Sequence, residues 1–257
     1  MSRNESGYTI PELLVTLILI GLFSTLLLTF MFGYWRYGAI QEADLDTLVT
    51  RLNASDYLRE QIGTSSGLIM QNSIQDANTL KPDPAIPSNL YWLPIHAIPG
   101  TATVSGTGVT PLLYYRRYSI NSTKAIITNG TTPYEDEFIL YINNATAQLM
   151  VRSLANTGAT GNILQTSCPP SLATSTCPAD KVIASNIKSI ASRYFSRAGN
   201  PIDYTSIYDN SIPGYIGPDF SVAEVVEITL NLQKKPFLQQ TQATINSTII
   251  RIALRNT

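Results

Sequence analysis

The chain has 257 residues, of which 44% are hydrophobic and 14% are charged, a balance that favours a membrane-anchored or secreted protein over a highly charged cytosolic one. Its 17 basic and 18 acidic residues leave a formal net charge of −1, which excludes a strong general attraction to nucleic acid or to acidic lipid. The single histidine excludes a metal site built from several histidines.

The first element is an uncharged segment from Leu13 to Trp35, which is 35 − 13 + 1 = 23 positions long. Because about 20 apolar residues cross the hydrocarbon core of a bilayer, we expect a membrane span here. The run is longer than the apolar region of about 7–15 residues in a cleaved secretory signal. One carboxylate, that of Glu12, stands immediately before the run, and an acid at the edge of lipid is costly enough to indicate a function.

The segment GYTIPELLV, from Gly7 to Val15, resembles the processing and assembly motif of type IV prepilins. That family has a short leader ending in Gly, then an aromatic residue, a Glu at the fifth position of the mature chain and a long apolar helix. Counted from Tyr8, Glu12 is the fifth residue, with Tyr8 standing where Phe is usual. The alternative interpretation is an ordinary single-pass anchor in which Glu12 has no special role.

The resemblance implies a processing step and a set of partners. A prepilin peptidase would cut after Gly7 on the cytoplasmic side, and would methylate the new amine of Tyr8. Glu12 of one subunit would then face the N-terminal amine of another pilin subunit, because an opposite charge offsets the cost of a carboxylate in apolar surroundings. The expected location is the cytoplasmic membrane, with the N-terminus inside and the head outside, and then a cell-surface pilus or a periplasmic pseudopilus.

Beyond the span, Leu45, Leu48, Val49 and Leu52 recur at helical spacing, so we expect the helix to continue to about residue 62 and to stop at Gly63. The sequence therefore divides into four parts. These are a leader (1–7), the transmembrane and assembly half of a stem helix (8–35), its amphipathic half (36–62) and a globular extracytoplasmic head (63–257).

Several segments of the head are rich in aromatic and β-branched residues, which are typical of strands. In residues 225–233 and 248–256 apolar and polar residues alternate, as expected of antiparallel strands with one buried face. Further strands are expected in residues 112–120, 136–144, 147–154 and 189–202, whereas the proline-rich residues 64–108 predict irregular, packed loops. The expected fold class is α+β, with the long N-terminal helix packed on an antiparallel β-sheet head.

A second resemblance covers about the last third of the chain. The segments YFSRAGNPI, VVEITLNL and ALRN, in that order, look like the head of PilW-like minor pilins and of the J-type minor pseudopilins of type II secretion. This resemblance implies a minor subunit that helps to initiate a filament or forms its tip. A hypothesis of a different class is a membrane-tethered binding head, an adhesin or DNA-capturing tip subunit that is not built into a filament.

The chemistry-bearing residues of the head are few. Cys168 and Cys177 have the wrong spacing for a C-x-x-C redox or zinc pair, and outside the cytoplasm we expect them to form a disulfide. The acidic run Glu135, Asp136 and Glu137 is a candidate calcium site, with a solvated strand entry as the competing interpretation. We find no phosphate loop or catalytic arrangement in the sequence, so we expect neither an enzyme nor a cofactor.

A basic pair among aromatic residues, YYRRY from Tyr114 to Tyr118, has the composition of a surface that binds single-stranded nucleic acid. In such surfaces aromatic rings stack on bases while arginine meets phosphate. Because the pair is isolated in a chain of balanced charge, an ordinary edge strand is the competing interpretation.

Overall fold

A computed structural model describes residues 9–95, 101–202, 223–234 and 244–254. The chain divides into two compact units, one formed by Met1–Asp46 and Lys235–Thr244, the other by Thr47–Lys234 and Ile245–Thr257. Helix α1 (Ile10–Gly63) begins in the first unit and ends in the second. The predicted long N-terminal apolar helix is therefore confirmed. We call the second unit, Thr47–Lys234 with Ile245–Thr257, the head unit, and the last part of α1, from Thr47, belongs to it.

Helix α1 ends close to the predicted position. The backbone N–H of Thr64 donates to the carbonyl of Glu60, and Ser65 donates to Ile62 through both its backbone N–H and its hydroxyl. A Cβ placed at Gly63 would lie 3.7 Å from Cγ2 of Ile252 in the last strand. The end of the helix is thus packed against the C-terminal part of the chain.

The first sheet of the head unit has five antiparallel strands in the order β1-β3-β6-β7-β8. They are β1 (Gly67–Ile69), β3 (Val109–Tyr118), β6 (Glu135–Asn143), β7 (Gln148–Leu154) and β8 (Lys181–Ala184). The three long strands match predicted segments, whereas β1 and β8 were not predicted because they are too short to carry a pattern.

The central strand β6 is buried on both faces, since every residue from Asp136 to Ile142 is buried. On one face, Tyr141 lies against the ring of Trp92 at 5.4 Å between ring centroids. On the other face, Phe138 stacks on Tyr115 at 5.1 Å. The irregular segment that contains Trp92 therefore covers one side of the sheet, which confirms the prediction of packed loops in that region.

The second sheet contains the strands that alternate in the sequence, in the order β10-β9-β11-β12, with β2 also paired to β9. They are β2 (Thr101–Thr103), β9 (Ile187–Ser196), β10 (Pro201–Ile202), β11 (Ala223–Lys234) and β12 (Thr244–Ala253). In β11 the buried apolar residues are Val226, Ile228, Leu230 and Leu232, as the alternation predicts. A separate two-stranded ribbon pairs β4 (Thr128–Asn129) with β5 (Thr132–Pro133).

The turn that joins β6 to β7 has an unexpected left-handed residue. Asparagine tolerates this conformation well, and Asn143 and Asn144 stand at the start of the turn. Instead Ala147 has a positive φ of 52°, while Asn143 uses its side-chain oxygen to accept the backbone N–H of Ala145. The next hairpin follows the expected chemistry, because Gly199 takes φ 80° between β9 and β10.

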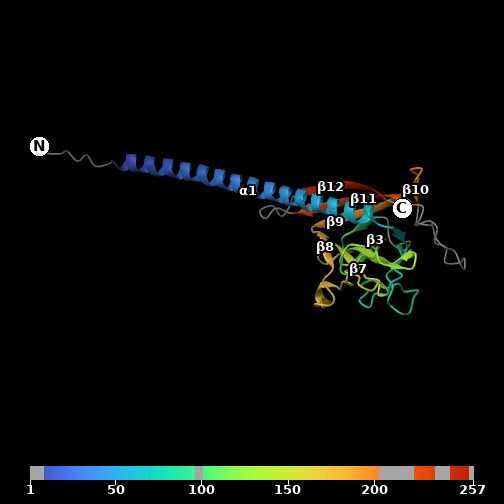
Figure 1. Ribbon diagram of the computed structural model, residues 1–257. Coiled ribbons are helices and arrows are strands. Elements are labelled where there is room, and N and C mark those ends of the chain that lie inside the picture. The colour runs from blue at the N-terminus through green and yellow to red at the C-terminus, as the bar shows by residue number, and fades with distance from the viewer. Residues whose placement is uncertain (1–8, 96–100, 203–222, 235–243, 255–257) are drawn as a thin grey trace. The chain divides into compact units, whose positions relative to one another are not determined.

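One hydrophobic core joins the C-terminal part of α1 to both sheets. Its helical members are Ala54, Leu58 and Ile62, which recur every four residues and so share one face of the helix. Figure 1 shows β9, β11 and β12 beside this part of α1, and the Asn246 side-chain amide donates to the hydroxyl of Thr47 at 2.9 Å. The described residues from Thr47 onward thus form an α+β unit with antiparallel sheets.

We predict that Leu58→Ala lowers the free energy of unfolding of the head by about 2–5 kcal/mol, because it leaves a cavity at a fully buried position. The matched control is Leu52→Ala on the same helix, where the leucine side chain is exposed and the change should be within about 0.5 kcal/mol. Urea unfolding of the full chain in detergent, followed by tryptophan fluorescence, measures both. Equal effects of the two substitutions would contradict the packing described here.

Candidate functional site

The N-terminal motif places its carboxylate in the first turn of α1. The Glu12 side chain accepts hydrogen bonds from the backbone N–H and from the hydroxyl of Thr9, both at 2.9 Å and both at Oε2. The carbonyl of Thr9 accepts the first helical bond, from the N–H of Leu13 at 3.1 Å. Thr9 is therefore the capping residue of the helix, and Glu12 satisfies its N–H as in a capping box. Gly7 and Tyr8, the predicted processing residues, lie outside the described residues.

Sequence reasoning missed this capping role of Glu12. The signal was readable, because Thr followed three residues later by Glu marks a helix start. A carboxylate offers about four acceptor positions, and the two bonds from Thr9 use only one oxygen. Among the described residues, the other oxygen, Oε1, accepts no hydrogen bond, so capping leaves it free for a further partner.

The first part of α1 is apolar and exposed on all sides, since every residue from Thr9 to Gly38 is exposed. An 18-residue window of the helix has a mean hydropathy of 2.5, and the helix is long and apolar enough to cross a membrane. Three hydroxyls in this part, those of Thr16, Thr25 and Thr29, bond to the carbonyl four residues earlier at 2.7–2.8 Å. They therefore bring no unpaired polar group into an apolar environment.

The predicted disulfide is present, with the Cα atoms of Cys168 and Cys177 5.5 Å apart. The bridged segment holds a short 3-10 turn, η2 (Pro170–Leu172), and mostly exposed residues. Beside it, Cys168 donates its N–H to Pro178 and accepts the N–H of Asp180, each at 2.8 Å. The disulfide therefore closes a surface loop directly beside a buried carboxylate.

That carboxylate, Asp180, belongs to a buried ion-pair network that was not predicted from the sequence. Arg152 of β7 is fully buried and binds Asp180 through Nε at 2.6 Å and Nη2 at 2.9 Å. Its Nη1 donates to Asp76 at 2.8 Å. One guanidinium thus joins the sheet to two segments that lie 76 and 28 residues away in sequence.

Neutral groups complete this network. Asp180 accepts the hydroxyl protons of Tyr141 at 2.5 Å and of Ser167 at 2.6 Å, and Asp76 accepts the indole N–H of Trp92 at 2.7 Å. Burial alone would lower the pKa of Arg152, but the hydrogen bond to Asp180 and the charges of Asp76 and Asp180 outweigh it, so the pKa is raised. Arginine remains charged, and the network is a structural feature of the head and not an exchangeable acid or base.

The three carboxylates of the acidic run at the start of β6 do not point to one position. Glu135 and Glu137 lie on one face of the strand and Asp136 on the other, as alternation requires. Asp136 is buried, and its Oδ1 accepts hydrogen bonds from Ser119, from the N–H of Asn156 and from the amide of Asn162 at 2.7–2.9 Å. The candidate calcium site in this run therefore lacks a shared position for three carboxylates, and within the described part of the chain no group of three His, Cys, Asp or Glu side chains could hold a metal ion.

The aromatic and basic residues of β3 are mostly engaged within the head. Tyr114 and Tyr115 are buried, Arg116 pairs with Glu137, and Arg117 bonds to the side chain of Gln61 on α1. Two of the three rings considered for base stacking are therefore inaccessible. The surface interpretation of this segment as a nucleic-acid site loses its physical basis.

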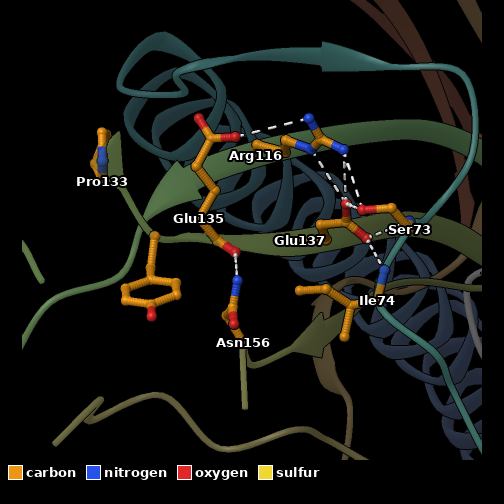
Figure 2. Close-up of a pocket in the computed structure, with 8 residues that line it drawn as sticks. Ser73, Ile74, Arg116, Pro133, Glu135, Glu137 and Asn156 are labelled. Atoms are coloured by element: carbon orange, nitrogen blue, oxygen red, sulfur yellow. Dashed lines mark hydrogen bonds and ion pairs between the residues drawn. The ribbon is translucent and has the colours of Figure 1, made fainter. Parts of the chain in front are cut away.

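A small recess of about 230 Å³ opens beside Arg116, and we call it the Arg116 recess. It is lined by Ser73, Ile74, Arg116, Pro133, Tyr134, Glu135, Glu137 and Asn156. In Figure 2, dashed lines join the Arg116 guanidinium to the carboxylates of Glu135 and Glu137. The sequence analysis singled out both carboxylates and the arginine, but only the pairing of β3 with β6 and the return of the loop at Ser73 bring them together.

Comparisons of the chain with family models, with curated proteins and with solved structures find no match.

We predict that Arg152→Met destabilises the head by about 3–5 kcal/mol, because it leaves two buried carboxylates without their counter-charge. Arg193→Met is the control, since Arg193 is exposed on β9 and should change stability by less than about 0.5 kcal/mol. Denaturant unfolding of the full chain measures the difference. Exposed ion pairs contribute at most about 1 kcal/mol to stability. A smaller loss than this in Arg152→Met would therefore be inconsistent with the buried ion pairs described here.

The buried tyrosines predict a loss of stability at alkaline pH. Burial raises the pKa of Tyr114, Tyr115 and Tyr141, and the hydrogen bond and charge of Asp180 raise that of Tyr141 further. The unfolded chain, with tyrosine pKa values of about 10, therefore loses these protons first. The stabilisation is complete below pH about 10 and is lost above it, by about 1.4 kcal/mol per tyrosine for each further pH unit.

An absorbance titration of tyrosinate, combined with unfolding curves at pH 9 and at pH about 11, tests this sign. The three tyrosines should ionise only together with unfolding, after the exposed ones among the 14 tyrosines of the chain. Ionisation of all tyrosines in one step with the head still folded would show that these side chains are not buried as described.

Proposed function

We propose that the chain is a minor pilin or pseudopilin, processed after Gly7 and built into a type IV pilus-like filament, where it helps to initiate assembly or forms the tip. The observation that carries the proposal is the first part of α1, an apolar helix exposed on all sides with one carboxylate, Glu12, in its first turn. An apolar surface of this extent has to be shielded from water by other apolar groups. A bilayer supplies it before assembly, and the helices of neighbouring subunits supply it afterwards.

The surroundings of the Glu12 carboxylate differ between the membrane and the filament. In the membrane the carboxylate lies at the start of the span, and Thr9 supplies two hydrogen bonds to its Oε2. In a filament the surroundings become apolar, and the charge requires an opposite charge nearby. The amine of a neighbouring Tyr8 is the partner that the motif implies, and it would reach the oxygen that Thr9 leaves unused.

The packing of the C-terminal part of α1 in the head also supports the proposal. Because Ala54, Leu58 and Ile62 of α1 are part of the hydrophobic core, the helix cannot leave the head without unfolding it. A force on the helix is therefore carried directly into the sheets. A subunit that is extracted from a membrane by its helix needs such a connection.

The location follows from the proposal. The N-terminus lies in the cytoplasm, the helix crosses the cytoplasmic membrane once, and the head lies outside. The disulfide between Cys168 and Cys177 favours this orientation, since disulfides persist in oxidising compartments and are rare in the cytosol. A plain membrane anchor would have the same orientation but would need neither processing nor Glu12.

The first experiment separates these two functions. The full chain is expressed with and without a prepilin peptidase, and its N-terminus is determined by mass spectrometry. We expect a chain that starts at an N-methylated Tyr8 only when the peptidase is present, and no processing of Gly7→Val, in which a β-branched side chain replaces the glycine before the cut. An intact Met1 under both conditions would reject the pilin proposal and leave a single-pass anchored head.

A second experiment tests the charge of Glu12. Glutamine can replace glutamate in a capping box, so Glu12→Gln keeps a side-chain acceptor for the Thr9 N–H and removes only the charge. We expect normal processing but a loss of at least tenfold in the amount recovered in sheared filaments. Glu42→Gln, an exposed carboxylate on the same helix, is the matched control and should assemble normally. Full assembly of Glu12→Gln would restrict Glu12 to the capping role.

A further inference from the structure

Several asparagines of the chain stand at the first position of the pattern Asn-x-Ser/Thr, where x is not proline. At this pattern an asparagine side chain can accept an N-linked glycan in a protein segment outside the cytoplasm. Because the pattern is short, it also occurs without modification, so the structure around each asparagine has to decide between them. The asparagines are Asn4, Asn53, Asn121, Asn129, Asn144 and Asn246.

Two of these asparagines use their amide nitrogen within the fold. Nδ2 of Asn144 donates to the hydroxyl of Thr110 at 3.1 Å, and Nδ2 of Asn246 donates to the hydroxyl of Thr47 at 2.9 Å. A glycan is bonded to this nitrogen and is bulky, so it would break both contacts. The folded head therefore disfavours modification at Asn144 and at Asn246.

Two further asparagines are excluded by their place in the chain. Asn53 is exposed but lies inside α1, and the next residue of its pattern, Ala54, is fully buried in the hydrophobic core. An enzyme that reads the three residues of the pattern cannot reach Ala54 while the head is folded. Asn4 belongs to the predicted leader and lies outside the described residues.

The ribbon of β4 and β5 presents Asn129 at its tip. Every residue from 128 to 132 is exposed. Asn129 pairs with Thr132, so a turn of two residues, Gly130 and Thr131, joins the strands. Gly130 has a φ of 63°, a conformation that glycine adopts without strain and that two-residue hairpin turns require at their first position. The turn therefore presents the whole pattern, from Asn129 to Thr131, to solvent.

The side chains of this pattern are also available, in contrast to those at Asn121. Asn121 is half-buried, and its Oδ1 accepts the N–H and the hydroxyl of Thr123 and the N–H of Ala125 at 2.7–3.0 Å. The Asn121 side chain thus holds its own loop in place. Within the described part of the chain, neither the Asn129 amide nor the Thr131 hydroxyl makes a hydrogen bond.

We propose that Asn129 is an N-glycosylation site, with an oligosaccharide linked to a lipid pyrophosphate as the donor. In the transfer, Nδ2 of Asn129 forms a bond to the anomeric carbon of the first sugar. The bond from that carbon to the pyrophosphate oxygen breaks, and the lipid pyrophosphate leaves with the electron pair. Nδ2 releases one proton, so the step is a substitution that needs neither an oxidant nor a reductant.

The inference requires that the head lie outside the cytoplasm, as proposed above and as the disulfide between Cys168 and Cys177 favours. It requires neither cleavage after Gly7 nor assembly into a filament. The mass of the N-terminal peptide reports on processing, whereas the mass of the peptide that contains Asn129 reports on the glycan. Failure of one proposal is therefore distinguishable from failure of the other.

The test uses the full chain purified from the membranes of its own host. After proteolytic digestion, mass spectrometry with a fragmentation method that keeps glycans attached places any added sugar mass on a single residue. We expect an oligosaccharide on Asn129, and unmodified peptides that contain Asn144 and Asn246. The inference is overturned if the Asn129 peptide carries no sugar, or if the sugar is bonded to a serine or threonine.

Variants test the pattern without changing the asparagine. Thr131→Ala removes the pattern, keeps Asn129 and should abolish the glycan, whereas Thr131→Ser keeps the pattern and should retain it. Thr146→Ala is the matched control, because it removes the pattern at Asn144 in another exposed turn and should leave the glycan mass unchanged. Unfolding curves equal to that of the unaltered chain confirm that each variant is folded. A glycan that persists on Asn129 in Thr131→Ala would contradict the inference.

Discussion

The head unit depends on one buried guanidinium, that of Arg152. Arg152 sits in β7 with no exposure to solvent, and it holds Asp180 from the disulfide side and Asp76 from the segment before β2. Both carboxylates lie in irregular segments. Their bonds to the Arg152 guanidinium therefore hold these segments against the sheet. A buried ion pair contributes little net stability compared with an apolar replacement, but it selects one arrangement because any other leaves a bare charge inside the protein. The irregular half of the head is therefore specified by charge, while the sheets are specified by apolar burial.

The second constraint is the division of α1 into two kinds of surface. Up to Gly38 the helix is apolar and exposed on every side, whereas from Thr47 it presents one buried face to the hydrophobic core. One helix thus combines a first part that is long and apolar enough to cross a membrane with an end that packs in the protein interior. This division carries the proposal of a subunit that moves from a bilayer into a filament, because only an apolar cover suits the first part and only an intact head suits the second.

Regular elements were predictable where a period repeats several times. The membrane-length run, the alternation in β11 and β12 and the cysteine pair all matched the structure, since each depends on local chemistry. The contacts that build the Arg116 recess and the Arg152 network were not predictable, because they join residues up to 76 positions apart through loops without a period. The capping of α1 by Thr9 is a different case, since its signal was local and was missed. In the β6–β7 turn the left-handed residue is Ala147, while Asn143 accepts the N–H of Ala145 through its side chain, and no repeating pattern in the sequence marks either role.

The two ends of the head sequence meet in its core. Thr47 on α1 bonds to Asn246 in β12, a separation of 199 residues, and Gly63 at the end of the helix lies against Ile252 of the same strand. Contacts of such long range form slowly, because the whole intervening chain must be ordered before they add stability. The core cannot close until β12 has been synthesised, since this strand follows all the other described strands in chain order. Until then the core that packs with the end of α1 is incomplete, and exposed apolar surface of this kind favours aggregation.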